Sequence, residues 1–292
     1  MCFTKKAKLG LGLCLLLGMA KLVLGVETIT VAATEYPNGE ILESAVKPLL
    51  AKQGYDLKII YYPSYNDDRI TFHQGPQINW QSTRLNPNFQ VIDGKADANF
   101  FQHQAYLDEF NQNYSVNLLA VESVFYVPYG LYVAKGKESA LVNTKNPRNI
   151  QSGSTVLIPD YFINEERSLH FLQNLHLLAL ESDSAHLNLQ DITNNPYQLD
   201  IYKADSSLLP TMLDSQKADI VIMNSGQASR QGIVFNRAII IEPQNSRYIN
   251  ILVTTKDNLN KPKLKALAKA LHSEEVKKFI QTKYHGEVIP AF

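Results

Sequence analysis

The segment 160–167 has the residue types of a receptor for a small anion. It reads Asp-Tyr-Phe-Ile-Asn-Glu-Glu-Arg, and the apolar pattern after it predicts a helix over residues 165–180. Asn164 would be the N-cap, and Arg167 would stand in the first turn, where the helix dipole disfavours a cation. A bound carboxylate or phosphate would resolve that conflict, because backbone N–H groups and a guanidinium both donate to anions. The alternative is a surface ion pair of Arg167 with Glu165, Glu166 or Asp160.

The stretch 97–106 concentrates aromatic and hydrogen-bonding side chains at a predicted strand-to-helix turn. It reads Asp-Ala-Asn-Phe-Phe-Gln-His-Gln-Ala-Tyr, with the helix expected to start near Phe101. Phe101 and Tyr106 could enclose an apolar side chain, and a neutral His103 could donate or accept a hydrogen bond. Local patterning alone favours the alternative, which is a capped helix followed by core aromatics.

Two asparagines occupy positions where an amide needs a partner. Asn224 follows the apolar run 218–223, and Asn250 lies inside the apolar run 248–253. An unpaired buried amide is costly, so each must bind either a ligand or the backbone. Spacing does not decide between these two roles.

The sequence contains no signature of catalysis. There is no G-x-S-x-G, no P-loop and no dinucleotide-binding fingerprint. Acidic pairs such as Asp67-Asp68 and Glu165-Glu166 are typical of solvated surface, and no general acid–base couple is marked. The seven histidines are dispersed without a metal-ligand spacing. We therefore expect a protein that is not an enzyme and has no metal site and no cofactor.

Strands and helices alternate along the chain. Strands are expected at 28–33 and 57–62, around a helix over 41–50 that Pro48 kinks and Gly54 ends. This β-α-β start predicts a parallel sheet covered by helices. Further strands are expected in two runs within 118–133 and at 155–158, 199–202, 220–223, 238–241 and 249–254, and further helices at 206–213, 261–271 and 274–284.

This order of elements predicts two α/β lobes. The first lobe would comprise residues 26–127 and 240–292, and the second would comprise residues 128–239. Ligands of such architectures bind between the lobes, beside strand ends and helix N-termini. Residues 64–95 are polar and aperiodic, and we expect a long loop or hairpin there, with 66–96 as a polar insert in the first lobe.

The first 25 residues have the pattern of an export signal. A basic start is followed by the apolar run 9–20 and by small residues that suit cleavage before Val26. The apolar run is short for a membrane span, although an uncleaved N-terminal anchor is the alternative. Both cysteines, Cys2 and Cys14, lie in this leader, so the mature chain would have neither disulfide nor thiolate. Cys14 lies inside the apolar run, which argues against its lipidation and favours a soluble periplasmic protein over a lipoprotein.

The charge balance argues against a nucleic-acid partner. The whole chain has 28 basic and 28 acidic residues. Removing the leader takes away four lysines and no acids, which leaves 24 basic against 28 acidic residues, a net charge of −4. A polyanion-binding protein normally carries a basic excess.

Several segments in order resemble the NlpA/MetQ family of methionine-binding components of ABC importers. The similarity runs from Thr28 to about Phe292, most of the mature chain. The motifs that carry it are Thr-Glu-Tyr-Pro-Asn-Gly-Glu-Ile-Leu-Glu at 34–43, Lys-Pro-Leu-Leu-Ala-Lys-Gln-Gly-Tyr-Asp-Leu at 47–57, Asp-Ala-Asn-Phe-Phe-Gln-His at 97–103, Asn-Glu-Glu-Arg-Ser-Leu at 164–169, Ile-Met-Asn at 222–224 and Tyr-Ile-Asn-Ile-Leu-Val at 248–253.

The resemblance implies a two-lobe fold of the type II periplasmic binding protein kind, with a mixed sheet flanked by helices in each lobe. It implies a monomer that binds L-methionine between the lobes and hands it to an ABC permease and ATPase complex, exported to the periplasm or peripherally attached to the membrane. Arg167, the helix start at Asn164 and Asn224 would hold the ligand carboxylate, and Asn250 the ammonium group. Aromatic and imidazole side chains would surround the thioether: Tyr65, Phe101, His103 and Tyr106.

Three departures from the family leave other functions open. Asn38 stands where the family usually has histidine, the segment between Tyr65 and Asp97 is longer, and the lipidation cysteine before the mature domain is missing. The ligand could therefore be another amino acid, a derivative or a short peptide. A third hypothesis is a surface interaction protein that has lost transport.

Overall fold

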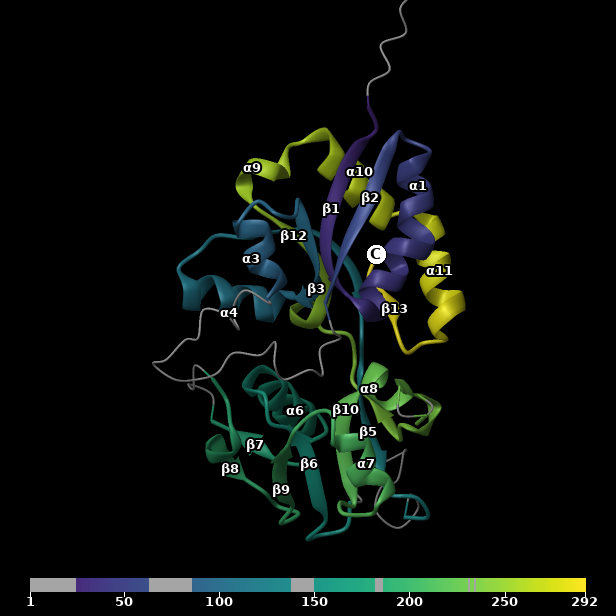
Figure 1. The fold of residues 1–292 in the computed structure, drawn as a ribbon. Helices are drawn as coiled ribbons and strands as arrows, with labels where there is room; N and C mark the ends of the chain where they lie inside the picture. The colour runs from purple at the N-terminus through teal and green to yellow at the C-terminus, as the bar shows by residue number, and fades with distance from the viewer. Residues whose placement is uncertain (1–24, 63–85, 138–149, 182–185, 231, 234) are drawn as a thin grey trace, which may run out of the picture.

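The strands of this protein form two mixed sheets, each covered by helices. The computed structural model describes residues 25–62, 86–137, 150–181, 186–230, 232–233 and 235–292. Figure 1 shows the first sheet with its helices in the upper half of the molecule and the second in the lower half. Within these described residues, the chain passes between the halves after residue 126 and after residue 241. The fold is therefore α/β with two lobes, as the sequence predicts.

The first sheet has the order β13–β4–β12–β3–β1–β2. Its strands are β1 (Glu27–Thr34), β2 (Tyr55–Tyr62), β3 (Ala98–His103), β4 (Leu119–Tyr126), β12 (Ile249–Thr254) and β13 (Ile289–Pro290). β1 pairs in parallel with β2 and β3, whereas β12 is antiparallel to β3 and β4. The helical segments of this lobe are η1 (Glu35–Gly39), η2 (Leu42–Val46), α1 (Lys47–Ala51), α3 (Pro87–Ile92), α4 (Gln104–Tyr114), α9 (Lys256–Leu259), α10 (Pro262–Leu271) and α11 (Glu274–Tyr284).

The second sheet has the order β11–β5–β10–β6–β9. Its strands are β5 (Tyr129–Val133), β6 (Thr155–Pro159), β9 (Asp200–Ala204), β10 (Ile220–Asn224) and β11 (Ile240–Ile241), beside a small sheet of β7 (Ala179–Leu180) and β8 (Ile192–Asn194). Its helical segments are α6 (Phe162–Asn174), η5 (Leu189–Asp191), α7 (Leu209–Asp214), α8 (Ser225–Arg230) and η6 (Phe235–Arg237), and η7 (Ser246–Tyr248) lies on the return to the first lobe. β11 pairs with β5, so the return begins at Glu242 rather than at residue 240 as expected.

The C-terminal helices show why the first lobe holds together. Val276, Ile280 and Tyr284 of α11 recur at helical spacing and are all buried. Ser273 caps this helix by accepting a hydrogen bond from the backbone N–H of Val276. The same core contains Ile29 and Val31 of β1, so the end of the chain completes the lobe that its beginning starts.

Some local expectations were wrong for identifiable reasons. Residues 87–92 form α3, whereas we expected loop, because Asn86 caps this helix and Pro87 occupies its first turn. The earlier part of the predicted insert, up to residue 85, lies outside the described residues. The helix expected near Phe101 begins at Gln104, because residues 98–103 pair with β1 and β12. The short helix α8 was not predicted.

A buried cluster of three amides supports the end of β3. Asn88 of α3 exchanges hydrogen bonds with Gln102, at 3.1 and 2.6 Å. Asn99 donates to Asn88 at 2.7 Å and accepts from Gln102 at 2.8 Å. All three side chains are fully buried. The cluster satisfies polar groups that would otherwise destabilise this core, and it fixes α3 against β3.

None of the described helices is both long enough and apolar enough to cross a lipid bilayer.

We expect Asn99→Ala to lower the free energy of unfolding by about 1–3 kcal/mol, because Gln102 loses an acceptor and Asn88 a donor inside the core. Urea denaturation measures this change. Asn113→Ala is the matched control, since Asn113 also bonds a side chain but is exposed on α4; it should change stability by less than about 0.5 kcal/mol. Equal effects of the two substitutions would contradict a stabilising role for the cluster.

Candidate functional site

A pocket of about 660 Å³, including its open mouth, lies between the two lobes. Both lobes and the first crossing, at Val127, contribute to its wall: Thr34, Tyr36, Pro37, Asn38, Phe101, His103, Phe125, Val127, Tyr129, Asn164, Arg167, Asn224, Gly226 and Asn250. No group of three or more His, Cys, Asp or Glu side chains suited to a metal occurs in the described parts of the chain.

Helix α6 brings Arg167 to this pocket from a different position than expected. The helix begins at Phe162 with Tyr161 as N-cap, so Asn164 is not the cap and lies within the first turn. Arg167 follows that turn, where the conflict with the helix dipole is smaller. The predicted start was wrong because the residues at the true start, 161 and 162, are aromatic and are not typical of a helix N-terminus, whereas Asn164 is.

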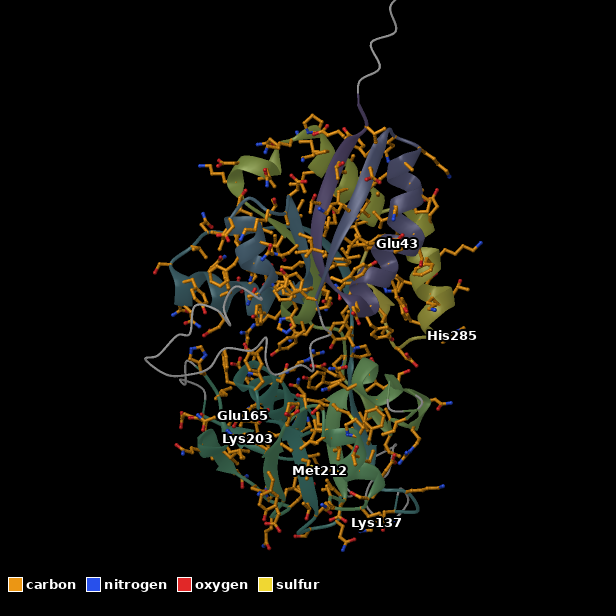
Figure 2. The ribbon with its side chains drawn as sticks, in the orientation of Figure 1. Glu43, Lys137, Glu165, Lys203, Met212 and His285 are labelled. Carbon is orange, nitrogen blue, oxygen red and sulfur yellow. The ribbon has the colours of Figure 1, made fainter. Side chains whose placement is uncertain are left out.

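The ion pairs expected around Arg167 are also different. Glu165 is buried rather than solvated, and it accepts hydrogen bonds from Lys203 at 2.9 Å and from the backbone N–H of Leu189 at 3.0 Å. Figure 2 shows Glu165 and Lys203 side by side in the lower lobe. Glu166 pairs with Arg247 at 3.2 Å. Glu165 and Glu166 therefore pair with other residues and not with Arg167.

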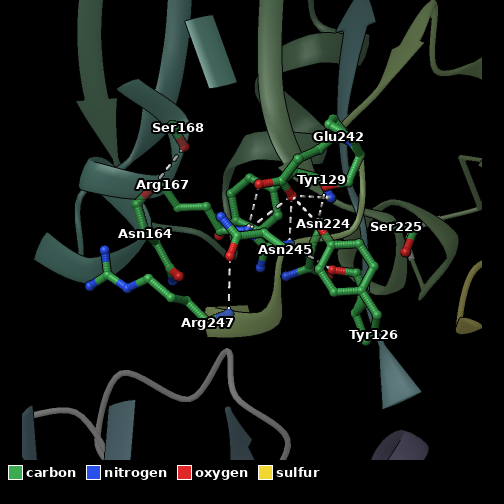
Figure 3. A network of polar contacts seen from close by, with 12 residues as sticks. Tyr126, Tyr129, Asn164, Arg167, Ser168, Asn224, Ser225, Glu242, Asn245 and Arg247 are labelled. Atoms are coloured by element: carbon green, nitrogen blue, oxygen red, sulfur yellow. Dashed lines mark hydrogen bonds and ion pairs between the residues drawn. The ribbon is translucent and has the colours of Figure 1, made fainter. Parts of the chain in front are cut away.

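The partner of Arg167 is Glu242, the first residue of the return to the first lobe. Arg167 donates from Nε to both carboxylate oxygens, at 3.2 and 3.0 Å, and from Nη2 to Oε2 at 2.6 Å. Figure 3 shows Arg167 beside Glu242, with dashed lines for the bonds between them. Nη2 also donates to the backbone carbonyl of Val127 at 2.9 Å, on the other crossing. Arg167 is 4% exposed and Glu242 7%. One guanidinium thus joins the second lobe to both connecting segments.

Three tyrosines enclose this ion pair. The guanidinium carbon lies 3.9 Å from the ring centre of Tyr129, 4.4 Å from that of Tyr248 and 5.3 Å from that of Tyr126. Tyr126 donates from its hydroxyl to Glu242 at 2.6 Å, and the backbone N–H of Tyr129 donates to the same carboxylate at 3.2 Å. Burial is the largest influence on the pKa of Arg167 and lowers it, but Glu242, Tyr129 and Tyr126 together outweigh burial, so the net shift is upward. Arg167 therefore stays charged.

One edge of Arg167 remains available to a ligand. Nη1 takes part in none of the hydrogen bonds among the described residues. A carboxylate in the pocket could accept from this edge. Because Glu242 already balances the positive charge, the pocket suits a zwitterion better than an anion with a net charge.

His103 ends β3 and caps α4. Its Nδ1 accepts the backbone N–H of Tyr106 at 3.2 Å, so the neutral ring carries its proton on Nε2. Burial, with help from Arg167 and Arg247, lowers the pKa of His103 to about 3. His103 is therefore neutral at physiological pH, and Nε2 is a second hydrogen-bond donor in the pocket wall.

The asparagines of the pocket differ in how they are held. Asn224 exchanges hydrogen bonds with Gln227, in a closed loop at the start of α8. The side chains of Asn164 and Asn250 form no hydrogen bond within the described parts of the chain, and each is partly exposed. Asn250 lies opposite His103 in the register of β12 and β3. These two amides can offer oxygens to an ammonium group.

Six of the eight predicted ligand-binding residues line one pocket, namely Phe101, His103, Asn164, Arg167, Asn224 and Asn250. Tyr106 does not line it: its hydroxyl accepts from Asn86 at 2.8 Å, and its ring packs edge-to-face on Phe101. It supports the pocket wall from behind. Tyr65 lies outside the described residues. That the six bind a ligand stays a prediction.

The sequence interpretation missed Glu242 and the tyrosines around it. A signal was present, because Glu242-Pro243 directly follows the last strand expected in the second lobe. An acidic residue at this position is typical of the end of a strand. The sequence does not show that the distant Arg167 lies next to it. Asn38 was noted only as a departure from the family, yet it lines the pocket.

Two mixed sheets with a pocket between them define the class of two-lobe periplasmic binding proteins. A family model described as NlpA lipoprotein matches residues 77–292. The chain therefore belongs to the NlpA lipoprotein family, which confirms the resemblance found in its sequence.

Similar proteins extend this result over most of the chain. Lipoprotein 28 of Escherichia coli O157:H7 is 34% identical over 72% of this chain and 75% of its own length. The methionine-binding lipoprotein MetQ of Bacillus subtilis is 30% identical over 91% of this chain and 89% of its own. A nutrient-binding protein of Burkholderia cenocepacia, solved bound to methionine, superposes with a TM-score of 0.71 at 25% identity, covering 90% of this chain and all of the other.

We expect Glu242→Gln to lower the free energy of unfolding by about 3–5 kcal/mol, because it leaves the buried Arg167 without a counter-charge. Urea denaturation at neutral pH measures this loss. Glu166→Gln is the control, since its partner Arg247 is largely exposed, and it should cost less than about 1 kcal/mol. A small loss in Glu242→Gln, similar to that of the control, would contradict the importance of the pair.

The buried, neutral His103 predicts a loss of stability in mild acid. Its pKa is about 3 in the folded protein and about 6.5 when unfolded, so the unfolded state binds more protons between these values. Its contribution is complete above pH 6.5 and is lost as the pH falls, by up to about 2 kcal/mol at pH 5. Denaturation midpoints at pH 7.5 and 5 should differ less in His103→Asn, which can still cap α4. An unchanged difference would show that other groups cause the acid sensitivity.

Proposed function

We propose that this protein is the exported solute-binding component of an ABC importer. It holds L-methionine between its lobes and delivers it to the permease and ATPase complex, either free in the periplasm or attached at the membrane surface. The observation that carries the proposal is the free guanidinium edge that Arg167 presents to the interlobe pocket. The charges of Arg167 and Glu242 cancel, so this pair adds no net charge to the pocket. The names of the B. subtilis relative and of the methionine-bound B. cenocepacia structure support methionine as the ligand.

The pocket matches the two ends of an amino acid. The carboxylate would accept from Nη1 of Arg167, and the ammonium group would donate to amide oxygens such as that of Asn250. The thioether would lie against Phe101 and the other apolar wall residues, where it needs few hydrogen bonds. Both charged ends of the ligand would then be paired. This pairing is needed because a charged group that is removed from water without a partner is strongly unfavourable.

Contacts across the two lobes suggest how ligand binding is coupled to delivery. Ser225 of α8 donates to the carbonyl of Glu287 at 2.5 Å, and Ser229 donates to its carboxylate at 2.8 Å. His186 of the second lobe approaches Glu109 of α4 at 4.0 Å. A ligand that contacts both lobes would favour the arrangement in which these contacts form, and the permease would dock on that closed state.

Calorimetry tests the proposal directly. The protein should be unfolded and refolded to remove retained ligand, then titrated with L-methionine, for which we expect binding in the micromolar range or tighter. Arg167→Lys should weaken binding by about tenfold or more, because lysine keeps the charge beside Glu242 but loses the planar edge. Absence of any binding of L-methionine or other amino acids by the refolded wild type would refute the proposal.

Arg247→Lys is the matched control for this variant. Arg247 lies close to the site, but it is largely exposed, pairs with Glu166 and does not line the pocket. Its replacement should leave the dissociation constant within about twofold of wild type. Equal weakening by the two substitutions would point to a general electrostatic effect rather than to recognition by Arg167.

A further inference from the structure

Glu287 accepts hydrogen bonds from both lobes. It lies in the first lobe, between α11 and β13. Its Oε2 accepts from the hydroxyl of Tyr36 in the same lobe at 3.3 Å, and its Oε1 accepts from the hydroxyl of Ser229 in the second lobe at 2.8 Å. Its backbone carbonyl accepts from the hydroxyl of Ser225, also in the second lobe, at 2.5 Å. One residue thus receives three donors where the two lobes meet.

Helix α8 supplies the two serines and also reaches the pocket. Ser225 is fully buried, and Figure 1 shows α8 at the edge of the second lobe that faces β13. Gly226 of this helix lines the pocket. A Cβ atom on Gly226 would lie 3.3 Å from Cε1 of Tyr36 in the other lobe. The glycine therefore allows α8 to come this close to the first lobe.

One pocket residue on each side connects the ligand site to this contact. In the second lobe, Asn224 lines the pocket and exchanges hydrogen bonds with Gln227 of α8. In the first lobe, Tyr36 lines the pocket, packs edge-to-face on Tyr284 and donates to Glu287. Glu287 itself lies outside the pocket wall. It can therefore act on a bound ligand only through the positions of the two lobes.

The bonds from the two serines form only while the lobes are together. When the lobes separate, Ser225 and Ser229 lose these acceptors and water replaces them. A hydrogen bond to a charged group is stronger than a neutral one, so the bond from Ser229 to the carboxylate favours the closed arrangement. A ligand enclosed between two lobes leaves when they open. An interaction that favours closure therefore slows ligand release.

We propose that Glu287 is a positioning residue that latches the two lobes together and thereby sets how long the ligand is retained. Its carboxylate holds α8 of the second lobe next to Tyr36 of the first, and it does so without touching the ligand. This inference rests on the proposed function, because it requires a ligand enclosed between the lobes.

Exchange of a labelled ligand tests this role. The refolded protein is loaded with isotopically labelled L-methionine, and release is followed after excess unlabelled L-methionine is added, while calorimetry gives the dissociation constant. We expect Glu287→Ala to raise the release rate and the dissociation constant together by about tenfold. The association rate should stay within about threefold of wild type. A residue that only stabilised the fold would not act on release alone.

Three further variants separate the latch from other effects. Ser229→Ala removes the donor from the second lobe and should also speed release. Combining it with Glu287→Ala should add less than about twofold, because both substitutions remove the same bond. Glu287→Gln keeps an oxygen that can accept from Ser229 and should restore part of the retention. Glu275→Ala is the matched control, since Glu275 is an exposed acid on α11 of the same lobe, and it should change release by less than about twofold.

The distance between the lobes gives a second measurement that does not require ligand binding. The chain has two cysteines, Cys2 and Cys14. With both replaced by serine, cysteines introduced at the exposed positions Lys278 of the first lobe and Lys217 of the second can carry spin labels. Glu287→Ala should increase the population of long distances between the labels, because it weakens closure.

Either measurement can overturn the inference. It would be overturned by an unchanged release rate in Glu287→Ala, or by a loss of affinity that comes mainly from slower association. A distance distribution that Glu287→Ala leaves unchanged, both with and without L-methionine, would overturn it as well. Failure of the wild type to bind L-methionine or any other amino acid would instead refute the proposed function, and the distances in the ligand-free protein would then decide whether the latch exists.

Discussion

The buried ion pair of Arg167 and Glu242 is the interaction on which the rest of the structure depends. It joins α6 of the second lobe to the segment that returns to the first lobe, and the bond from Arg167 to Val127 adds the other crossing. Two charges shielded from water are tolerated only when each is fully paired. The geometry of the two crossings is therefore tied to the orientation of one guanidinium, which is also the group best placed to receive a ligand.

Pairing with Glu242 shapes the chemistry of the pocket. An unpaired buried arginine would attract any small anion, whereas this one has its charge balanced and only Nη1 to offer. Recognition then depends on hydrogen-bond geometry at both ends of the ligand more than on net charge. The neutral His103 adds no charge at physiological pH, because its pKa is about 3. Such a pocket is suited to zwitterions, the form that free amino acids with neutral side chains take at this pH.

The topology explains why residues so distant in sequence meet. Asn38 follows β1, His103 ends β3, α6 follows β6, and Asn224 ends β10. β1 and β3 are parallel, as are β6 and β10, so each pair presents its carboxyl ends at the same edge of its sheet. Ligand sites of α/β proteins form at these edges. Two such edges face each other across the pocket.

The sequence by itself determined the alternation of strands and helices, the two-lobe architecture, the family and six residues that line one pocket. Local periodicity and ordered motifs carry that information, because they depend on neighbours along the chain. Only the tertiary structure decided that Arg167 pairs with Glu242, that Tyr106 supports the wall without lining the pocket, and that Ser225 donates to Glu287 of the other lobe. Each of these depends on the distance between segments far apart in the chain, and on burial that removes water as an alternative partner.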